Sequence, residues 1–133
     1  MHLDYDKIKL FLEIFIEDEK PFLDTSELFL KLNYNSNLDE DRKEIWHYLK
    51  ILSEQDLIEC IDDKEKLGFS FLGNGVIVYS IKRFRITNTG YQIYESISAN
   101  KIWNKIKKPL KTLGVESLKQ IPSLAIKILT EIN

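Results

Sequence analysis

The side chains that could do metal or nucleophilic chemistry are few in this chain and stand far apart. Besides its carboxylates the chain holds two histidines, His2 and His47, and one cysteine, Cys60. A zinc site needs several converging ligands, and the spacing of these three residues matches no zinc motif. We expect His47 on an exposed helix face and Cys60 as a small buried residue on a strand. The sequence therefore predicts no catalytic residue, no metal, no cofactor and no enzymatic activity.

Gly73-Asn74-Gly75 has the glycine content of a phosphate-binding loop, but no Lys-Ser/Thr pair follows it. Asn-Gly is instead typical of a tight β-hairpin, because these residues tolerate positive φ at both central positions of the turn. We predict that the turn separates two extended segments, residues 67–72 and 76–86.

Nine cationic or titratable side chains, in three groups, are the candidates for binding an anion. They are Lys43, His47, Lys50, Lys82, Arg83, Arg85, Lys101, Lys105 and Lys108. The first three follow the outer face of a predicted helix, the next three lie in the predicted hairpin, and the last three form a stripe on a later helix. Lysine and arginine placed in this way neutralise the phosphates of nucleic acid. The alternative, that they are solubilising charges on amphipathic elements, stays open at this point.

The charge is divided unequally along the chain. Residues 1–66 hold 18 acidic and 9 basic side chains, and residues 67–133 hold 3 acidic and 10 basic ones, although the net charge is only −2. Such polarity can steer an anionic partner to one side or let two copies associate. No apolar run is long enough to cross a bilayer, and the first residues do not resemble a signal peptide. We expect no membrane contact and a cytoplasmic protein.

Hydrophobic periodicity predicts helices over most of the chain. The expected helices cover residues 4–18, a short segment after the capping-box pattern Asp24-x-x-Glu27, residues 38–54, 87–97, a segment capped by Asn100, and residues 117–132. Pro109 is expected to kink or end the fifth of these helices. A short strand is expected at residues 57–61. The fold class is therefore α+β and mostly helical, with the third helix burying Ile45 and Leu49.

Three helices, a strand and a two-stranded hairpin follow one another as in a winged helix-turn-helix. The segments Trp46-His47-Tyr48-Leu49-Lys50-x-Leu52 and Arg85-Ile86-Thr87-x-x-Gly90 look like the end of its third helix and the exit from its wing. With the opening Leu3-Asp4-Tyr5-Asp6-x-Ile8 and the segment 97–105 around Trp103, the chain resembles a family of small, uncharacterised phage- and prophage-associated winged-helix proteins. Asp56 stands where winged helices commonly have Gly. The resemblance implies a winged-helix domain over residues 1–98 and a C-terminal helical extension, residues 99–133, packed on the same domain.

Two functions fit this sequence. The first is a phage-associated regulator that binds double-stranded DNA through the wing and the Lys-rich C-terminal helix. Asp39-Glu40-Asp41 at the start of the third helix would repel phosphates, so wing-led or backbone-dominated contact is the version we expect. The second is a protein-interaction module, a phage-encoded adaptor or inhibitor for a host or phage protein. In that case Leu124 and Ile126 on the last helix are the expected interface, and a homodimer is one form it could take.

Overall fold

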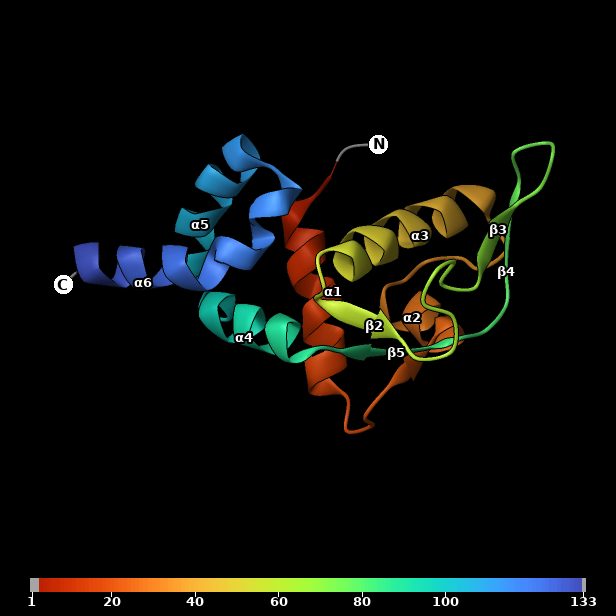
Figure 1. Ribbon diagram of the computed structural model, residues 1–133, viewed down its shortest axis with the longest axis horizontal. Coiled ribbons are helices and arrows are strands. Elements are labelled where there is room, and N and C mark those ends of the chain that lie inside the picture. Colours follow the sequence, from red (N-terminus) through yellow and green to blue (C-terminus); the bar gives the residue numbers. More distant parts are fainter. Residues whose placement is uncertain (1–2, 133) are drawn as a thin grey trace.

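The computed structural model describes residues 3–132, so His2 lies outside the described residues. The elements in chain order are α1 (Tyr5–Glu17), β1 (Leu23–Asp24), α2 (Thr25–Lys31), α3 (Asp39–Glu54), β2 (Ile58–Cys60), β3 (Phe69–Phe71), β4 (Ile77–Tyr79), β5 (Arg83–Ile86), α4 (Asn88–Ile97), α5 (Asn100–Leu113), the 3-10 helix η1 (Val115–Gln120) and α6 (Ile121–Ile132). The fold is α+β and mostly helical, as the sequence predicts (Figure 1).

The first three helices begin and end on local side-chain signals. The Asp4 carboxylate accepts the Asp6 backbone N–H at the start of α1, and Asp24 and Glu27 form the predicted capping box at the start of α2. These contacts satisfy backbone donors that the helix itself leaves unpaired. In α3 the predicted stripe is buried, with both Ile45 and Leu49 fully covered.

Asp56 ends α3 in the left-handed conformation, with φ of 62°. Its N–H donates to the Ser53 carbonyl at 3.0 Å, and the Leu57 N–H donates to the Leu52 carbonyl at 2.8 Å. This is the Schellman arrangement that glycine usually closes, and Asp tolerates it at a modest cost. The tight stop turns the chain directly into β2.

The segment 76–86 is two strands rather than the single one expected. Its first part, β4, pairs with β3, whereas its second part, β5, lies between β1 and β2 in a separate three-stranded antiparallel sheet. The chain crosses from one sheet to the other at Lys82, where the Thr25 hydroxyl bonds both the N–H and the carbonyl of Lys82. The crossing changes the phase of the alternation, because the buried residues Ile77 in β4 and Phe84 in β5 stand seven positions apart.

Asn74 lies at the tip of the β3–β4 hairpin, as predicted, but the turn geometry differs from the expectation. The Gly75 N–H donates to the Leu72 carbonyl at 2.9 Å, and only Gly75, with φ of 84°, is left-handed. Asn74 keeps a negative φ, so the loop is one residue longer than a two-residue turn with two positive φ angles. Figure 1 shows this hairpin projecting from the body beyond α3.

The start of α4 explains the Thr87-x-x-Gly90 pattern. The Thr87 hydroxyl accepts the Gly90 N–H at 3.0 Å as the helix cap. A Cβ on Gly90 would lie 2.1 Å from the Leu57 carbonyl oxygen, so this close approach of α4 to the start of β2 requires glycine.

Two expectations for the C-terminal helices were wrong, and one of the two alternatives for Pro109 does not hold. Ala99, which has no capping side chain, precedes α5, and the Asn100 amide oxygen instead accepts a hydrogen bond from Lys9. Pro109 does not end α5, which continues to Leu113. The last α-helix begins at Ile121 and not at residue 117, which puts Pro122 in its first turn, where a missing backbone N–H costs little. The residues before it form the 3-10 turn η1.

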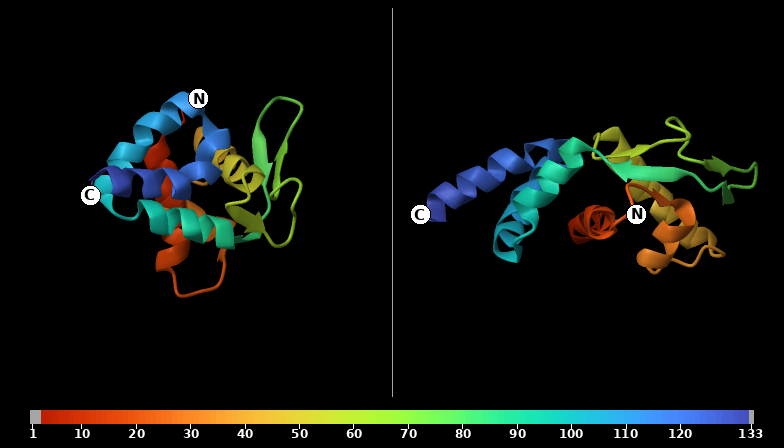
Figure 2. Two further views of the ribbon diagram at one scale, coloured as in Figure 1. Left: turned by 60° about the vertical axis from the view of Figure 1, so that its left-hand side comes forward. Right: turned by 90° about the horizontal axis from the view of Figure 1, so that it is seen from below.

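One hydrophobic cluster joins the N-terminal helices to α5 and α6. Fully buried side chains come from both parts, among them Phe11 in α1 and Ile106 in α5. The molecule is elongated, with the β3–β4 hairpin at one end of its long axis and α5 and α6 at the other (Figure 2). No helix within residues 3–132 has both the length and the apolar character needed to span a membrane.

Candidate functional site

The cationic candidates on α3 are engaged by acidic neighbours. Lys43 pairs with Asp39 at 2.8 Å, and Lys50 lies 4.0 Å from Glu54. His47 is half-buried, and burial lowers the pKa of its imidazole, so the side chain is neutral at physiological pH. The outer face of α3 therefore offers little uncompensated positive charge.

Arg83 and Arg85 lie in β5, in the three-stranded sheet, and not in the projecting hairpin where the sequence places them. Arg83 forms a bidentate ion pair with Asp62, in which the closest approach is 2.7 Å, and Arg85 pairs with Glu59 at 2.8 Å. The guanidinium and backbone N–H of Arg83 lower the pKa of Asp62 to about 2. Lys82 is half-buried at the crossing between the two sheets. The assignment of these three residues to a basic wing was thus wrong.

The lysines of α5 are in a different situation. Lys101, Lys105 and Lys108 are exposed, and Lys111 continues the same face one turn later. None of the four makes an ion pair with another residue within 3–132, and α5 contains no acidic residue. At 1.5 Å rise per residue the four ammonium groups are spread along about 15 Å of helix. We call these four residues the lysine face.

Contacts with α1 hold the lysine face in place. The Trp103 indole N–H donates to the Asp6 carboxylate at 2.6 Å, Lys107 pairs with the same carboxylate at 3.1 Å, and the Tyr5 hydroxyl donates to the Leu110 carbonyl at 3.1 Å. The hydrogen bond from the Trp103 indole, and after it the one from Lys107, lowers the pKa of Asp6. Because the inner side of α5 is fixed by these groups and by buried apolar residues, the four residues of the lysine face point away from the body.

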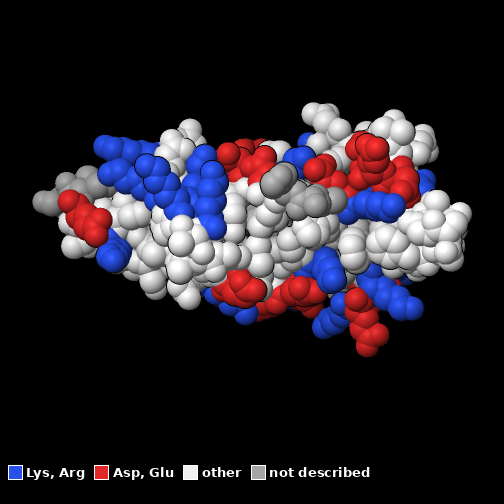
Figure 3. Space-filling model, turned by 90° about the horizontal axis from the view of Figure 1, so that it is seen from above, with Lys and Arg blue, Asp and Glu red and all other residues white. Residues whose placement is uncertain are grey.

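Cationic side chains gather at the end of the molecule that α5 and α6 form, whereas acidic ones are concentrated over its middle and over the α3 end (Figure 3). The charge asymmetry of the sequence is therefore also a separation in space. Two further exposed lysines, Lys119 and Lys127, lie in η1 and α6.

The two residues expected at a partner interface on the last helix lie on different sides of it. Leu124 is partly buried and packs against the core, whereas Ile126 is 66% exposed. Ile126 shares the open side with Leu129, which is 48% exposed. Leu124 and Ile126 do not form one exposed patch, because most of the Leu124 side chain packs against the core.

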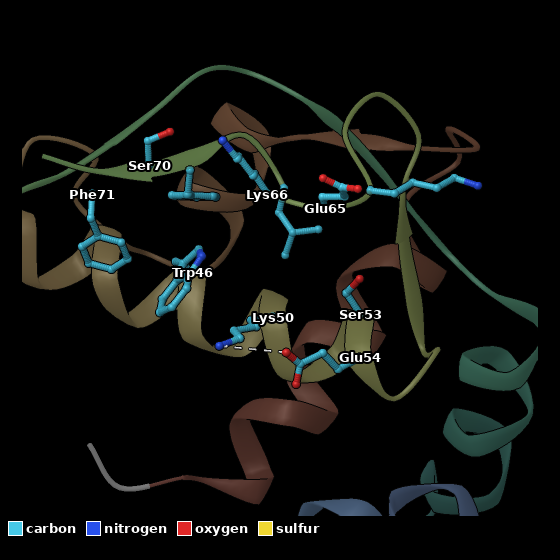
Figure 4. Close-up of a pocket in the computed structure, with 11 residues that line it drawn as sticks. Trp46, Lys50, Ser53, Glu54, Glu65, Lys66, Ser70 and Phe71 are labelled. Atoms are coloured by element: carbon cyan, nitrogen blue, oxygen red, sulfur yellow. Dashed lines mark ion pairs between the residues drawn. The ribbon is translucent and has the colours of Figure 1, made fainter.

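The hairpin end carries a groove that sequence reasoning missed. The groove has a volume of about 570 Å³, and α3, the loop before β3 and β3 itself line it. In Figure 4 Trp46 rises from α3 beside Phe71 of β3, and Lys50 lies along α3, joined by a dashed line to Glu54. Trp46 and Phe71 meet edge to face with ring centroids 5.1 Å apart, and the Lys50 ammonium lies 5.1 Å from the centre of the Trp46 ring.

A signal for this region was present in the sequence. Residues 67–81 contain no Asp, Glu, Lys or Arg over fifteen positions, the longest such run in the chain. Several of its apolar side chains are exposed, namely Phe71, Leu72, Val76 and Ile81. A hairpin with apolar residues on both faces is unusual for a surface element and points to an interaction.

No three His, Cys, Asp or Glu side chains gather as metal ligands would within residues 3–132. Cys60 is buried, as expected, and burial raises the pKa of its thiol. Comparisons of the chain with protein-family models, with curated proteins and with solved structures find no match.

Proposed function

We propose that this protein is a non-enzymatic nucleic-acid-binding module that contacts the phosphate backbone through the lysine face of α5. The observation that carries the proposal is a set of four exposed lysines that form no ion pair with any of residues 3–132, on a helix that has no acidic residue. Uncompensated cations in a row along a rigid helix bind a polyanion without reading its sequence, since phosphates carry no sequence information.

We further propose that the part of the chain up to α4 is a winged helix-turn-helix. Support comes from the order of α1, α2, α3 and the strands, and from the projecting β3–β4 hairpin in the position of a wing. In this proposal the DNA-reading surface usual for such domains is not used for phosphates, because α3 begins with Asp39, Glu40 and Asp41, and the hairpin has no cation.

The proposal is tested by the fluorescence anisotropy of a labelled mixed-sequence duplex of about 20 base pairs across a range of salt concentrations. Four phosphate contacts predict a slope of log K against log salt of roughly −3 to −4. The double variant Lys105→Gln/Lys108→Gln should weaken binding at least tenfold in 50 mM salt and flatten the slope by about 2.

The matched control is Lys43→Gln/Lys50→Gln, which removes two lysines that acidic neighbours already compensate. It should leave affinity and slope nearly unchanged. Absence of salt-sensitive binding by the parent chain would refute nucleic-acid binding. A large loss in the α3 variant, with none in the α5 variant, would refute the lysine face as the contact.

A further inference from the structure

We propose that the groove beside β3 binds an extended peptide by strand addition, and that this peptide is an apolar segment flanked by one acidic and one basic residue. The groove and the lysine face lie at opposite ends of the molecule and share no residue. The inference is therefore independent of nucleic-acid binding.

The two edges of the β3–β4 hairpin differ in whether their outward backbone N–H and C=O groups are bonded. Phe71 and Ile77 are paired in register, next to the hydrogen-bonded pair formed by Leu72 and Val76. In antiparallel strands such a neighbouring pair directs its N–H and C=O groups outward. The Ile77 N–H donates to the Asp39 carboxylate at 2.9 Å, and the Ile77 carbonyl accepts from Arg42 at 3.2 Å. Side chains of α3 thus occupy the β4 edge.

The β3 edge is covered only at its first residue, where the Phe69 N–H donates to the Lys66 carbonyl at 3.0 Å, and it is open at Phe71. Among residues 3–132 no group bonds the N–H or the carbonyl of Phe71. Natural proteins protect free edges with lysine, proline or bulges, and β3, with the sequence Phe-Ser-Phe, has none of these. An unprotected edge with apolar side chains is a template for another strand.

The groove provides the space that an added strand needs. A strand placed about 4.8 Å from β3 would lie over the second half of α3. Alternate side chains of that strand would face Trp46, Lys50 and Ser53, which line the groove (Figure 4). At the end of the groove the buried Leu67 adopts a left-handed φ of 57°, which holds the loop against β3. The aromatic pair Trp46–Phe71 favours apolar side chains on the peptide.

Charge defines the flanks of the peptide. Lys50 is compensated by Glu54, and Lys64 by Glu59. Lys66 and Glu65 also line the groove, are exposed, and make no ion pair within the described residues. Figure 4 shows Lys66 on the side of Ser70 and Glu65 farther from it. Complementarity then requires a carboxylate beside Lys66 and a cation beside Glu65.

The test is selection of a displayed library of random twelve-residue peptides on the full chain, followed by titration of the enriched peptides. We expect enrichment of segments with apolar residues at alternate positions between an acidic and a basic residue. In an amide NMR spectrum the Phe71 N–H should shift on binding. Lys66→Glu should weaken binding about threefold, and exchanging the acidic residue of the peptide for lysine should restore it.

Phe71→Pro removes the outward N–H and is tolerated at an edge position, so it should abolish binding. Lys101→Glu at the other end of the molecule is the matched charge control and should have no effect. No enrichment above the Phe71→Pro chain, or shifts confined to amides outside the groove, would overturn the proposal. Sedimentation could also overturn the proposal. If the parent chain is a dimer and Phe71→Pro is a monomer, the β3 edge pairs with a second copy of the chain and not with a peptide.

Discussion

At one end of the long axis α5 presents four lysines that pair with no carboxylate among residues 3–132, and at the other end the segment of the β3–β4 hairpin, residues 67–81, is uncharged. The cations between these ends, such as Arg83 and Arg85, are held by carboxylates. A count of lysines and arginines along the sequence therefore misleads, because a compensated cation attracts a polyanion much less than a free one. The difference separates a surface suited to phosphates from a surface suited to apolar chains.

The two ends also differ in how far their buried residues belong to the main core. From this difference we expect the largest effect of a substitution, a loss in the free energy of unfolding. Ile106 under the lysine face and Ile77 in the hairpin are both fully buried. Ile106→Ala opens a cavity in the main core and should lower the free energy of unfolding by about 3 kcal/mol in urea denaturation. Ile77→Ala should lower the free energy of global unfolding by less, because a projecting two-stranded hairpin opens locally before the core unfolds.

Hydrogen exchange of the hairpin amides distinguishes the two variants. Ile77→Ala should accelerate exchange there, and Ile106→Val, which keeps most of the volume, should not. Equal global losses for the two alanine variants would mean that the hairpin is as integral to the core as α5 is.

A second prediction concerns the β4 edge of the hairpin, where side chains of α3 bond the backbone of Ile77. Asp39→Ala leaves the Ile77 N–H without its partner, so the amides of β3 and β4 should exchange roughly tenfold faster while α5 keeps its protection. Glu40→Ala is the control, since it removes a neighbouring acidic residue of the same helix turn without touching β4. If Glu40→Ala has the same effect, general helix electrostatics and not the bond to Ile77 holds the hairpin.

Acid should loosen the lysine end through Asp6. The Trp103 indole and Lys107 hold the pKa of this carboxylate below its ordinary value of 3.8, so its contribution to stability is present above about pH 4 and is lost as the pH falls through the lowered pKa. Fluorescence of Trp103 followed from pH 7 to pH 2 should show this transition. Asp6→Asn should remove it and leave transitions due to other carboxylates in place. An unchanged acid profile in Asp6→Asn would mean that other contacts fix α5.

The smallest effect is expected between the two ends, at Asp56. Asp56→Gly relieves a left-handed residue and should stabilise the protein by about 0.5 kcal/mol in urea denaturation. Neither DNA affinity nor peptide affinity should change. Asp56→Val, which tolerates this conformation poorly, should destabilise, and a stabilising valine would refute the backbone explanation.

Local signals in the sequence predicted most elements of the fold. The capping residues Asp24 and Thr87, the stripe of α3 and the position of Asn74 were predicted because each is determined by neighbours within a few residues. The crossing at Lys82 was not predicted, and the sequence left open whether α5 continues past Pro109, because tertiary contacts decide both. One is a bond to Thr25, and the other is the packing of α5 against α1 and α6.

The candidate sites were predictable only in part for the same reason. Lysine spacing alone predicted the exposed stripe of Lys101, Lys105 and Lys108, because α5 lacks acidic residues and no carboxylate elsewhere in the described part of the chain pairs with them. The partners of Arg83 and Arg85 lie more than twenty residues away in the chain, and only the β2–β5 register and the Asp62 loop bring them close. The free edge of β3 depends equally on which strand pairs where.

The central claim, that phosphates bind the α5 end and not the α3–hairpin end, is tested most directly by one amide NMR titration of the full chain with a short mixed-sequence DNA duplex. We predict shifts that saturate at the amides of residues 101–111, weaken with salt and leave residues 39–54 and 67–81 unchanged. Shifts centred on α3 and the hairpin, with the α5 amides unmoved, would contradict the account.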